Sequence, residues 1–366
     1  VPNLRFPEFK GEWEDKKLGD LCSEFKSGKN IKSAEILEDG KFPVFGGNGL
    51  RGFTHKYNYN GEYVIVGRQG ALCGNVRLVE GKCYMTEHAI VIQGSEDNNT
   101  KFLLYLLDKL NLGQYSDQSA QPGLAVNKLQ KIKVTIPNLS EQNKIASFLF
   151  LLDQRIKTQI KIIEDLKVLQ NTLIDYYYHH QRYDKNVSLF DCISQTSERN
   201  KKNNAFPVLS VSNKYGFIQQ IEQFENRKVA SEDISNYKIV RKNDFAYNPA
   251  RINVGSIAKL IKYSNGIVSP MYICFRAKDN FLPDFLEFYF KSKQFKNEVL
   301  KRLEGSVRQC LPFEGLCDIP VVFPPKEKQK DIITQLSAIQ TKIEIETTIK
   351  ELQLKQKQHL LHQMLI

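Results

Sequence analysis

A long apolar stripe constrains this chain more than any other feature of its sequence. Residues 140–181, SEQNKIASFLFLLDQRIKTQIKIIEDLKVLQNTLIDYYYHHQ, contain neither glycine nor proline. Apolar side chains recur in this stretch three or four positions apart, which predicts a helix with one buried face. Such a helix would be about 60 Å long, far longer than a globular core requires, so we expect it to pack along a partner. The stripe consists of Ile145, Leu149, Leu152, Ile156, Ile160, Ile163, Leu166, Leu169 and Leu173.

The same pattern returns later in the sequence at a constant offset of 187 positions, as for Pro137 and Pro324 (324 − 137). The preceding segments also agree, LQKIKVTIP at 129–137 with LCDIPVVFP at 316–324, and each is typical of a strand that a proline ends. A globular domain followed by a long helix is therefore predicted twice, and a repeat of this size determines the architecture. Other matched pairs are Gln142 with Gln329, Ile145 with Ile332, Leu149 with Leu336, Leu152 with Ile339, Ile156 with Ile343, Leu173 with Leu360 and Ile174 with Leu361.

The stretches before the two helices consist mainly of short predicted strands bounded by glycine, followed by a short helix. Scaffold positions match between the two stretches, whereas the loops differ in sequence. The predicted fold class is therefore α+β, with antiparallel or mixed sheets in two β-rich globular domains. The predicted elements are strands at 42–47, 61–67, 74–81 and 88–94 with a helix at 100–110, and the corresponding segments 206–216, 242–260 and 269–276 with a helix at 285–291.

We predict a first globular domain at 1–138, a central long helix at 139–184, a second globular domain at 185–324 and a distal long helix at 325–366. Because the two apolar stripes are alike, we expect each helix to be the partner of the other, and the duplication gives a pseudo-two-fold internal repeat. Three consecutive tyrosines, 176–178, exceed what a two-helix seam needs, and we expect them to help form a protein docking surface. The predicted seam comprises Ile145, Leu149, Leu152, Ile156, Ile332, Leu336, Ile339 and Ile343.

The composition predicts a cytoplasmic protein with no membrane partner. The formal net charge of +11 and the pI near 9.1 favour a polyanionic partner, although an ordinary basic soluble protein has the same balance. The seven cysteines are odd in number and form no CxxC pair or Cys/His cluster of zinc spacing, which indicates thiols in a reducing compartment. The longest apolar run, near 145–152, is too short to span a bilayer.

No motif predicts a catalytic residue, a cofactor or a metal. Residues 47–52, GNGLRG, match GxGxxG, but the aromatic segment FTHKYNYNG follows where a dinucleotide fold would need a helix. The tetrapeptide at 248–251, NPAR, lacks the second proline and the aromatic residue of the amino-methyltransferase motif. The six histidines have no further ligands at metal-binding spacing. The chain itself is therefore not expected to be an enzyme.

Basic and amide side chains concentrate in the predicted loops of both domains. Arginine pairs with the two acceptors of guanine and asparagine or glutamine with adenine, so these are the residue types of major-groove readout. Lysine and arginine around them would supply the salt-dependent contacts to phosphates, although each residue alone is more often a solvated surface group. The candidates are Asn48, Arg51, Arg68, Gln69, Gln118, Gln121 and Lys128 in the first domain, and Asn213, Lys214, Asn248, Arg251, Asn253, Arg308 and Gln309 in the second.

This layout resembles the specificity subunit of type I restriction-modification enzymes, and the resemblance covers the whole chain. Its most particular parts are the helix entries IPNLSEQNKIASFLFLLDQRI at 136–156 and FPPKEKQKDIITQLSAIQTKI at 323–343. The segments FPVFGGNG, GRQGALCGNV and TEHAIVI also look like recognition segments of that family. Target residues of the family lie in variable loops, so the resemblance assigns no individual base contact.

The resemblance implies a non-catalytic subunit that binds double-stranded DNA. The two globular domains would be target recognition domains, each reading one half of a bipartite site. The resemblance also implies that the two long helices pack as an antiparallel coiled coil, which would set the gap between the half-sites. The implied partners are two methyltransferase subunits, for adenine methylation, and restriction subunits that act as ATP-dependent translocase and nuclease. One alternative of another class remains: a non-catalytic adaptor or scaffold with duplicated protein- or glycan-binding domains, which weak and sequence-indifferent DNA binding would favour.

Overall fold

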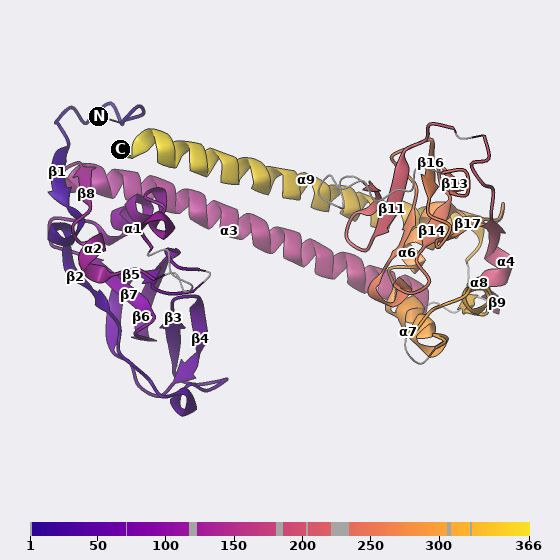
Figure 1. The fold of residues 1–366 in the computed structure, drawn as a ribbon, viewed down its shortest axis with the longest axis horizontal. Coiled ribbons are helices and arrows are strands. Elements are labelled where there is room, and N and C mark those ends of the chain that lie inside the picture. Colours follow the sequence, from indigo (N-terminus) through magenta and orange to yellow (C-terminus); the bar gives the residue numbers. More distant parts are fainter. Residues whose placement is uncertain are drawn as a thin grey trace. The chain divides into compact units, whose positions relative to one another are not determined.

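The computed structural model describes residues 2–70, 72–116, 123–180, 186–202, 204–220, 234–305, 309–322 and 324–366. The chain divides into two compact units: unit 1 comprises Val1–Lys161 and Thr348–Ile366, and unit 2 comprises Ile162–Thr347. Two long helices, α3 (Leu139–Asp175) and α9 (Lys326–Met364), each contribute one part to either unit (Figure 1). The two long helices predicted from the repeat are therefore present.

Unit 1 contains a six-stranded mixed sheet in the order β2-β7-β5-β6-β3-β4. Neighbouring strands are antiparallel, except that β3 and β6 run parallel. Helix α1 (Thr100–Lys109), capped by the Asn99 side chain, packs on β5, β6 and β7. The strands and remaining short helices are β1 (Glu14–Lys17), η1 (Leu18–Leu21), β2 (Cys22–Ser27), η2 (Ser33–Glu35), β3 (Phe42–Gly46), β4 (Gly49–Thr54), β5 (Tyr59–Gly67), β6 (Val76–Met85), β7 (Ala89–Gly94), η3 (Leu112–Tyr115), α2 (Val126–Leu129) and β8 (Lys133–Ile136).

Unit 2 contains two four-stranded sheets, in the orders β10-β17-β14-β15 and β12-β11-β16-β13, together with the pair β18-β9. Its α6 (Pro283–Tyr289) begins with a proline, and Ser292 caps α7 (Lys293–Lys301). The other elements are η4 (Tyr176–His180), β9 (Asn186–Ser188), α4 (Leu189–Cys192), β10 (Ile193–Thr196), β11 (Val208–Ser212), β12 (Gly216–Gln219), β13 (Lys238–Arg241), β14 (Phe245–Tyr247), η5 (Ile252–Val254), β15 (Ile257–Lys259), β16 (Asn265–Val268), β17 (Ile273–Ala277), α8 (Phe313–Cys317) and β18 (Pro320–Val322). Both units confirm the α+β class.

One glutamine recurs near the start of both long helices and joins each helix to the globular part of its unit. The buried side chain of Gln142 accepts a hydrogen bond from the Asn99 amide (3.0 Å) and donates to the carbonyl of the proline before the helix (2.9 Å). Gln329 accepts from the Leu282 amide (3.1 Å) and donates to its own preceding proline (3.0 Å). Asn99 and Leu282 are the N-caps of α1 and α6, so each glutamine fixes a short helix against a long one.

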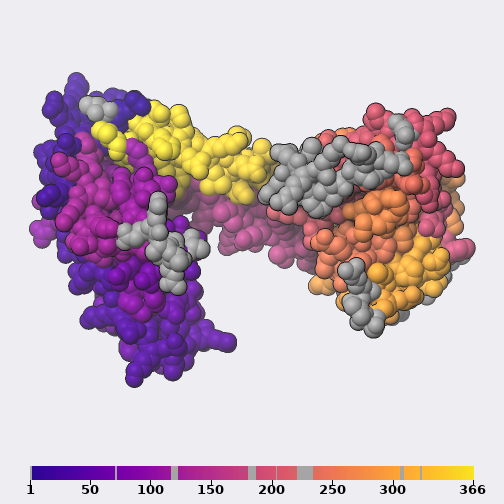
Figure 2. Space-filling model, in the orientation of Figure 1, coloured from indigo at the N-terminus to yellow at the C-terminus, as the bar shows by residue number. Residues whose placement is uncertain are grey.

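Within each unit the two long helices lie antiparallel and share an apolar core. In unit 1 the first part of α3 packs with the last part of α9, so that Leu149 and Leu361 belong to one cluster. The C-terminal end of α9 also lies beside the N-terminal segment, where the Leu4 amide donates to the carbonyl of Gln363 (Figure 2). In unit 2, Ile174 of α3 shares a cluster with Leu336 of α9. Of the predicted seam residues, Ile145, Leu149, Ile156, Ile332, Leu336 and Ile343 are buried, while Leu152 and Ile339 are partly buried.

The apolar stripe predicted for α3 is wrong at two positions. Ile160 and Leu169 are 41% and 47% exposed, whereas Gln159 and Gln170 are buried. Counting alternately three and four positions onward from Ile156 leads to 159, 163, 166 and 170, which is the heptad spacing of a helix that packs on one partner. Helix geometry therefore decides which positions face inward, and two polar side chains occupy positions in this buried row.

The tyrosine cluster serves the core of unit 2 rather than the docking surface expected for it. Tyr178 is buried, and its hydroxyl donates to the carbonyl of Phe285 at 2.6 Å. The Tyr177 hydroxyl donates to the side chain of Gln335 on α9 at 2.5 Å. Only Tyr176 exposes half of its surface. Two of the three rings thus stabilise the packing of α3 within unit 2.

We predict that Leu149→Ala lowers the free energy of unfolding by about 2–5 kcal/mol, because it leaves a cavity at a fully buried site. Leu336→Ala, at the equivalent position of α9, should have a similar effect in unit 2. Leu151 is 63% exposed on the same turn of α3, so Leu151→Ala provides the control and should change unfolding by less than about 0.5 kcal/mol. Denaturant unfolding followed by circular dichroism measures all three, and equal losses for Leu149→Ala and Leu151→Ala would contradict the buried seam.

Candidate nucleic-acid interface

Three connections of the unit 1 sheet converge: the β3–β4 turn at 46–49, the end of β5 at 67–69 and the β6–β7 connection at 86–88. The amide of Arg68 donates to the carbonyl of His88 (3.0 Å), and the amide of Thr86 donates to that of Phe45 (2.9 Å). Main-chain hydrogen bonds therefore bring together four sequence-predicted residues from separate stretches. These residues are Asn48, Arg51, Arg68 and Gln69.

Glycine is required in this convergence because main chains meet there without room for a side chain. A Cβ atom at Gly47 would lie 2.7 Å from the carbonyl oxygen of His88, and one at Gly67 would lie 2.4 Å from that of Leu72. Gly49 adopts a positive φ of 102°, which permits the tight β3–β4 turn. The GxGxxG match at 47–52 therefore belongs to a hairpin: its last four residues are the start of β4, where a dinucleotide fold would have a turn leading into a helix.

The side chains of this cluster are mostly cationic or amide groups. The Arg77 guanidinium lies against Gly49, and the aliphatic part of Arg51 lies against Gly46. The His88 ring stands between an amide and a carboxylate, with Nδ1 3.1 Å from Gln69 Oε1 and Nε2 3.2 Å from Glu87 Oε1. Sequence reasoning missed Arg77, Glu87 and His88 as site residues, although the segment TEH at 86–88 stood out. We call Asn48, Arg51, Arg68, Gln69, Arg77 and His88 the unit 1 turn cluster.

Unit 2 brings together two connections in a similar way, the β11–β12 turn and the β14–β15 connection. The Ser256 hydroxyl donates to the carbonyl of Val211 (3.0 Å), and Gly255 lies beside Asn213. The predicted residues Asn213, Lys214, Arg251 and Asn253 are exposed on these connections. Asn248 is different: it is buried, and its side chain closes the turn by accepting from the amide of Ala250 (3.1 Å). Its predicted role as a base reader is therefore corrected to a structural one.

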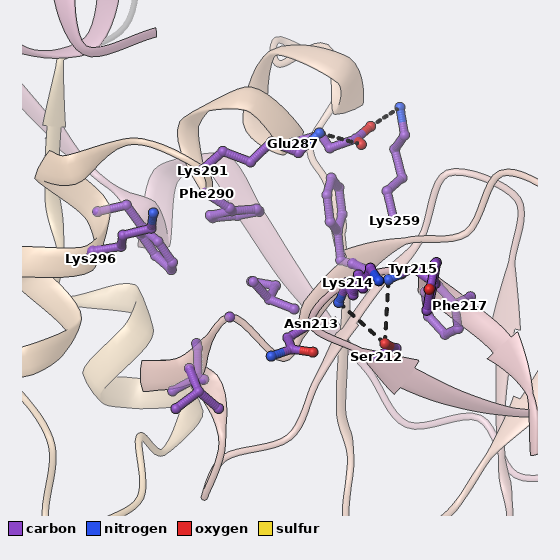
Figure 3. Close-up of a pocket in the computed structure, with 18 of the residues that line it drawn as sticks. Ser212, Asn213, Lys214, Tyr215, Phe217, Lys259, Glu287, Phe290, Lys291 and Lys296 are labelled. Atoms are coloured by element: carbon purple, nitrogen blue, oxygen red, sulfur yellow. Dashed lines mark hydrogen bonds and ion pairs between the residues drawn. The ribbon is translucent and has the colours of Figure 1, made fainter. Parts of the chain in front are cut away.

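A cleft of about 840 Å³ adjoins the exposed turns of unit 2 (Figure 3). Its walls come from the β11–β12 turn, the η5 connection, α6 and α7, and one side of α3. Among the described residues, five lysines and one glutamate line it, so its charge is predominantly positive. Aromatic groups line it as well, and Tyr215 at its edge is 66% exposed. The lysines are Lys214, Lys259, Lys262, Lys291 and Lys296.

Two of the five lysines are neutralised by acidic neighbours. Lys259 pairs with Asp284. It also pairs with Glu287 at 2.9 Å, and Glu287 pairs in turn with Lys291 at 3.1 Å (Figure 3). Burial alone would lower the pKa of Lys259, but these carboxylates reverse the effect and leave the pKa raised. Burial likewise favours a raised pKa for Glu287, and the two lysines bring it below the ordinary value. Lys259 and Glu287 therefore stay charged, and Lys291 is held by the same carboxylate.

The other three lysines are available to an anionic ligand. Lys214, Lys262 and Lys296 form no ion pair with a described residue; Lys214 lies over the ring of Tyr215, 4.9 Å from its centroid. Lys262 lies 5.5 Å from the ring centroid of Tyr263. Lys262, Lys296 and Tyr215 were not among the sequence-predicted residues, because neither their spacing nor their neighbours in the chain set them apart from ordinary surface groups.

The remaining predicted residues lie elsewhere or outside the described residues. Lys128 is exposed on α2, following the segment in which the Leu124 amide donates to the carbonyl of Arg68. Gln309 is exposed and lies next to Cys310 in the chain, near Leu311, whose amide donates to the carbonyl of Pro249 in the β14–β15 connection. Gln118, Gln121 and Arg308 lie outside the described residues.

The described part of the chain contains no group of three or more histidine, cysteine, aspartate or glutamate side chains placed to hold a metal ion. All seven cysteines are free thiols, and burial raises the pKa of Cys83 to about 11 and that of Cys274 to about 12. Among the same described residues, no helix has the length and apolar character to cross a bilayer.

Comparison with known proteins identifies the family. The family model described as type I restriction modification DNA specificity domain matches residues 10–167 and again residues 191–355. The two matches together cover most of the chain and coincide with the two halves of the internal repeat. The chain belongs to the type I restriction-modification DNA specificity family.

Individual relatives agree with this assignment. The specificity subunit of the Escherichia coli type I enzyme EcoprrI is 41% identical over 150 residues, which are 40% of this chain and 37% of that protein. The specificity subunit of the Methanocaldococcus jannaschii enzyme MjaVIII is 23% identical over an alignment covering 95% of this chain and 90% of the relative. Three relatives, among them the EcoprrI subunit, are matched over only 36% to 56% of their own length. A crystal structure of a type I system S subunit from M. genitalium shares the fold, with a TM-score of 0.69 and 15% identity over 100% of this chain and 99% of that chain.

We predict that Gly47→Ala destabilises unit 1 by about 1–3 kcal/mol, because the added methyl group would force the β3–β4 turn away from the His88 carbonyl. Gly123→Ala is the matched control, since a Cβ there would come no closer than 4.0 Å to a described atom, the carbonyl oxygen of Arg68. This control should be neutral or slightly stabilising. Denaturant unfolding compares the two variants, and equal stability would show that the turn can move freely.

Proposed function

We propose that this chain is the sequence-reading subunit of a type I restriction-modification complex, with its recognition domains at 1–138 and 185–324. One observation carries the proposal: each unit brings distant connections together into one cluster of cationic and amide groups, and the groups differ between the units. Because a reader of two unlike half-sites needs a common scaffold with unlike contacts, this arrangement suits a bipartite DNA target.

In the proposed complex, exposed arginine and amide side chains contact base edges. Arg51 and Arg77 in unit 1 and Arg251 in unit 2 offer the paired donors that guanine accepts, and Asn48, Gln69, Asn213 and Asn253 offer the donor and acceptor that adenine requires. The lysines of the unit 2 cleft supply contacts to phosphates, which position the domain without reading sequence. A positive net charge over the whole chain supports the same partner.

The chemistry of the complex is assigned to its partners. We propose that two methyltransferase subunits bind the chain and modify adenine, and that restriction subunits join them for ATP-dependent cleavage. The chain's own contribution is binding and orientation. The antiparallel packing of α3 and α9 would act as the spacer between half-sites. Family membership leaves the adaptor or scaffold alternative without support.

The direct test is to map adenine methylation in cells that carry the chain with its methyltransferase, and in cells that lack only this chain. We expect a two-part motif with a fixed unspecified gap, which disappears when the chain is deleted. Expression of the methyltransferase alone is the control for background modification. An unchanged methylation pattern, with the complex shown to be assembled, would overturn the proposed function.

Two substitutions in unit 2 should impair DNA binding in different ways. Arg251→Ala should relax base preference at one half-site and leave the other intact, because base contacts carry discrimination of about 1–3 kcal/mol each. Lys296→Gln should weaken binding to specific and non-specific DNA alike and lower the slope of log K against log salt by about 1. Fluorescence anisotropy with the assembled complex, over a salt series, measures both.

Lys330→Gln is the matched control for the cleft, because Lys330 is an exposed lysine of the same unit that pairs with Glu327 on α9. It should leave the salt slope unchanged. If the Lys296→Gln complex has the same salt slope as the unaltered complex, the cleft is not part of the DNA interface. Loss of preference at both half-sites in Arg251→Ala would indicate a general phosphate or folding role for that arginine.

A further inference from the structure

The side chains of Gln69 and His88 meet where two connections of the unit 1 sheet converge. Gln69 is exposed just after β5, and its Oε1 lies 3.1 Å from Nδ1 of the His88 ring in the β6–β7 connection. Because an amide oxygen can only accept, Nδ1 carries a proton and donates the hydrogen bond. Within the part of the chain that the structure describes, this is the contact that holds the Gln69 side chain.

The main chain fixes the place of both residues. The amide of Arg68 donates to the carbonyl of His88 (3.0 Å), and the carbonyl of Arg68 accepts from the amide of Leu124 (2.9 Å). The amide of Ala89 donates to the carbonyl of Thr86 (3.0 Å) and closes the turn that contains the histidine. Only the side-chain torsions of the glutamine and the histidine are therefore left to be set by their own contact.

A carboxylate lies on the other side of the ring. Glu87 Oε1 is 3.2 Å from Nε2 of His88, and Glu87 Oε2 is buried without a hydrogen-bond partner among the described residues. Turning the ring would separate it from both neighbouring oxygens. The direction of the ring is therefore set from two sides, although the His88 side chain is 46% exposed.

The direction of a side-chain amide matters for reading a base, because its two ends have opposite hydrogen-bonding character. In the major groove adenine presents an acceptor (N7) beside a donor (N6), whereas guanine presents two acceptors (N7 and O6). An amide that can turn over offers either a donor or an acceptor at one place, and so tolerates both purines. An amide held by its oxygen, as that of Gln69 is, keeps its NH2 group in one place and distinguishes them.

Unit 2 contains the same turn without the histidine. A main-chain hydrogen bond of 3.0 Å closes the turn at 269–272, as one of equal length closes the turn at 86–89. The third residue of the unit 2 turn is Met271, which has no side-chain N–H or O–H, whereas that of the unit 1 turn is His88. The fold of this turn therefore does not require a histidine.

Unit 2 also lacks the amide that a histidine would hold. The carbonyl of Pro249 accepts from the amide of Leu311 (3.0 Å), as the carbonyl of Arg68 accepts from a leucine in unit 1. The next residue is Ala250 in unit 2 and Gln69 in unit 1. The amide and the imidazole are present together in one unit and replaced together in the other, as expected of two groups that act as a pair.

We propose that His88 is a positioning residue for DNA reading by unit 1: it fixes the Gln69 amide, so that Gln69 distinguishes adenine from guanine at one position of the half-site. The ligand is the major-groove edge of a purine, which Gln69 contacts and His88 does not. The inference rests on the proposed function and adds the group that directs one reader. The arginines of the turn cluster need no such support, since a guanidinium carries donors alone.

The test measures base preference with the assembled complex, on the bipartite site found by methylation mapping. Each A·T pair of both half-sites is exchanged for G·C and each G·C for A·T, one at a time, with the purine kept on its strand, and binding is followed by fluorescence anisotropy. Gln69→Ala should reduce the preference at one position by about 5- to 150-fold, the range of a single base contact. His88→Met, which introduces the residue that unit 2 carries in this turn, should reduce the preference at that same position and at no other.

Two further variants separate a positioning role from a structural one. The double variant Gln69→Ala with His88→Met should lose no more preference than Gln69→Ala alone, because the histidine acts through the amide. His88→Asn retains a side-chain NH2 group near the place of Nδ1 and should keep most of the preference. His55→Met, the same change at another exposed histidine of unit 1, is the control and should leave every preference unchanged. Denaturant unfolding verifies that each variant is folded.

The outcomes distinguish this inference from the function on which it rests. If the His88→Met complex keeps the preference of the unaltered complex at every position, the inference is wrong and the proposed function stands. A double variant that loses clearly more preference than Gln69→Ala would also overturn the inference, and so would a Gln69→Ala complex with unchanged preferences. An unaltered complex that binds all of these DNA sites equally would instead overturn the proposed function.

Discussion

Burial of each long helix against its own unit is the interaction on which the rest of the structure depends. Leu149 and Leu336 hold equivalent positions in the repeat, and each is completely buried in the apolar core of its unit. Gln142 and Gln329 add the same hydrogen bonds at the start of each helix. Because these contacts recur with one spacing, each unit can hold its sheets and turns against its helix in the same manner, whatever side chains its loops carry.

The long helices were predictable because several features of the sequence indicate them independently. The apolar residues have helical spacing, and the same pattern occurs twice at a constant offset. The prediction went wrong where it followed residue type instead of geometry, choosing Ile160 and Leu169 over Gln159 and Gln170. Strand β4 was missed for a related reason. Its sequence, GLRGFT, has no simple alternation, and it becomes a strand because the turn at 46–49 returns it to β3. Short-range patterns do not encode such tertiary pairings.

The candidate site was predictable by residue type but not by position. Loop arginines and amides such as Arg51 and Gln69 were identified because DNA readout needs those groups, and the structure brings them together. Arg77 escaped notice because it lies within a strand, and its approach to Gly49 depends on how β6 and the β3–β4 turn meet. The prediction that Asn248 contacts a base differs from its observed place in a turn, because an amide that closes a turn looks the same in sequence as one that faces a ligand.

The two units hold their exposed turns by different means, which bears on how their contacts can vary. In unit 1, main-chain bonds such as that from Arg68 to His88 fix the convergence, and the contact between the side chains of His88 and Gln69 adds to them. In unit 2, side chains share this role: Ser256 donates to Val211, and Asn248 closes its own turn. Substitutions there remove support as well as contact.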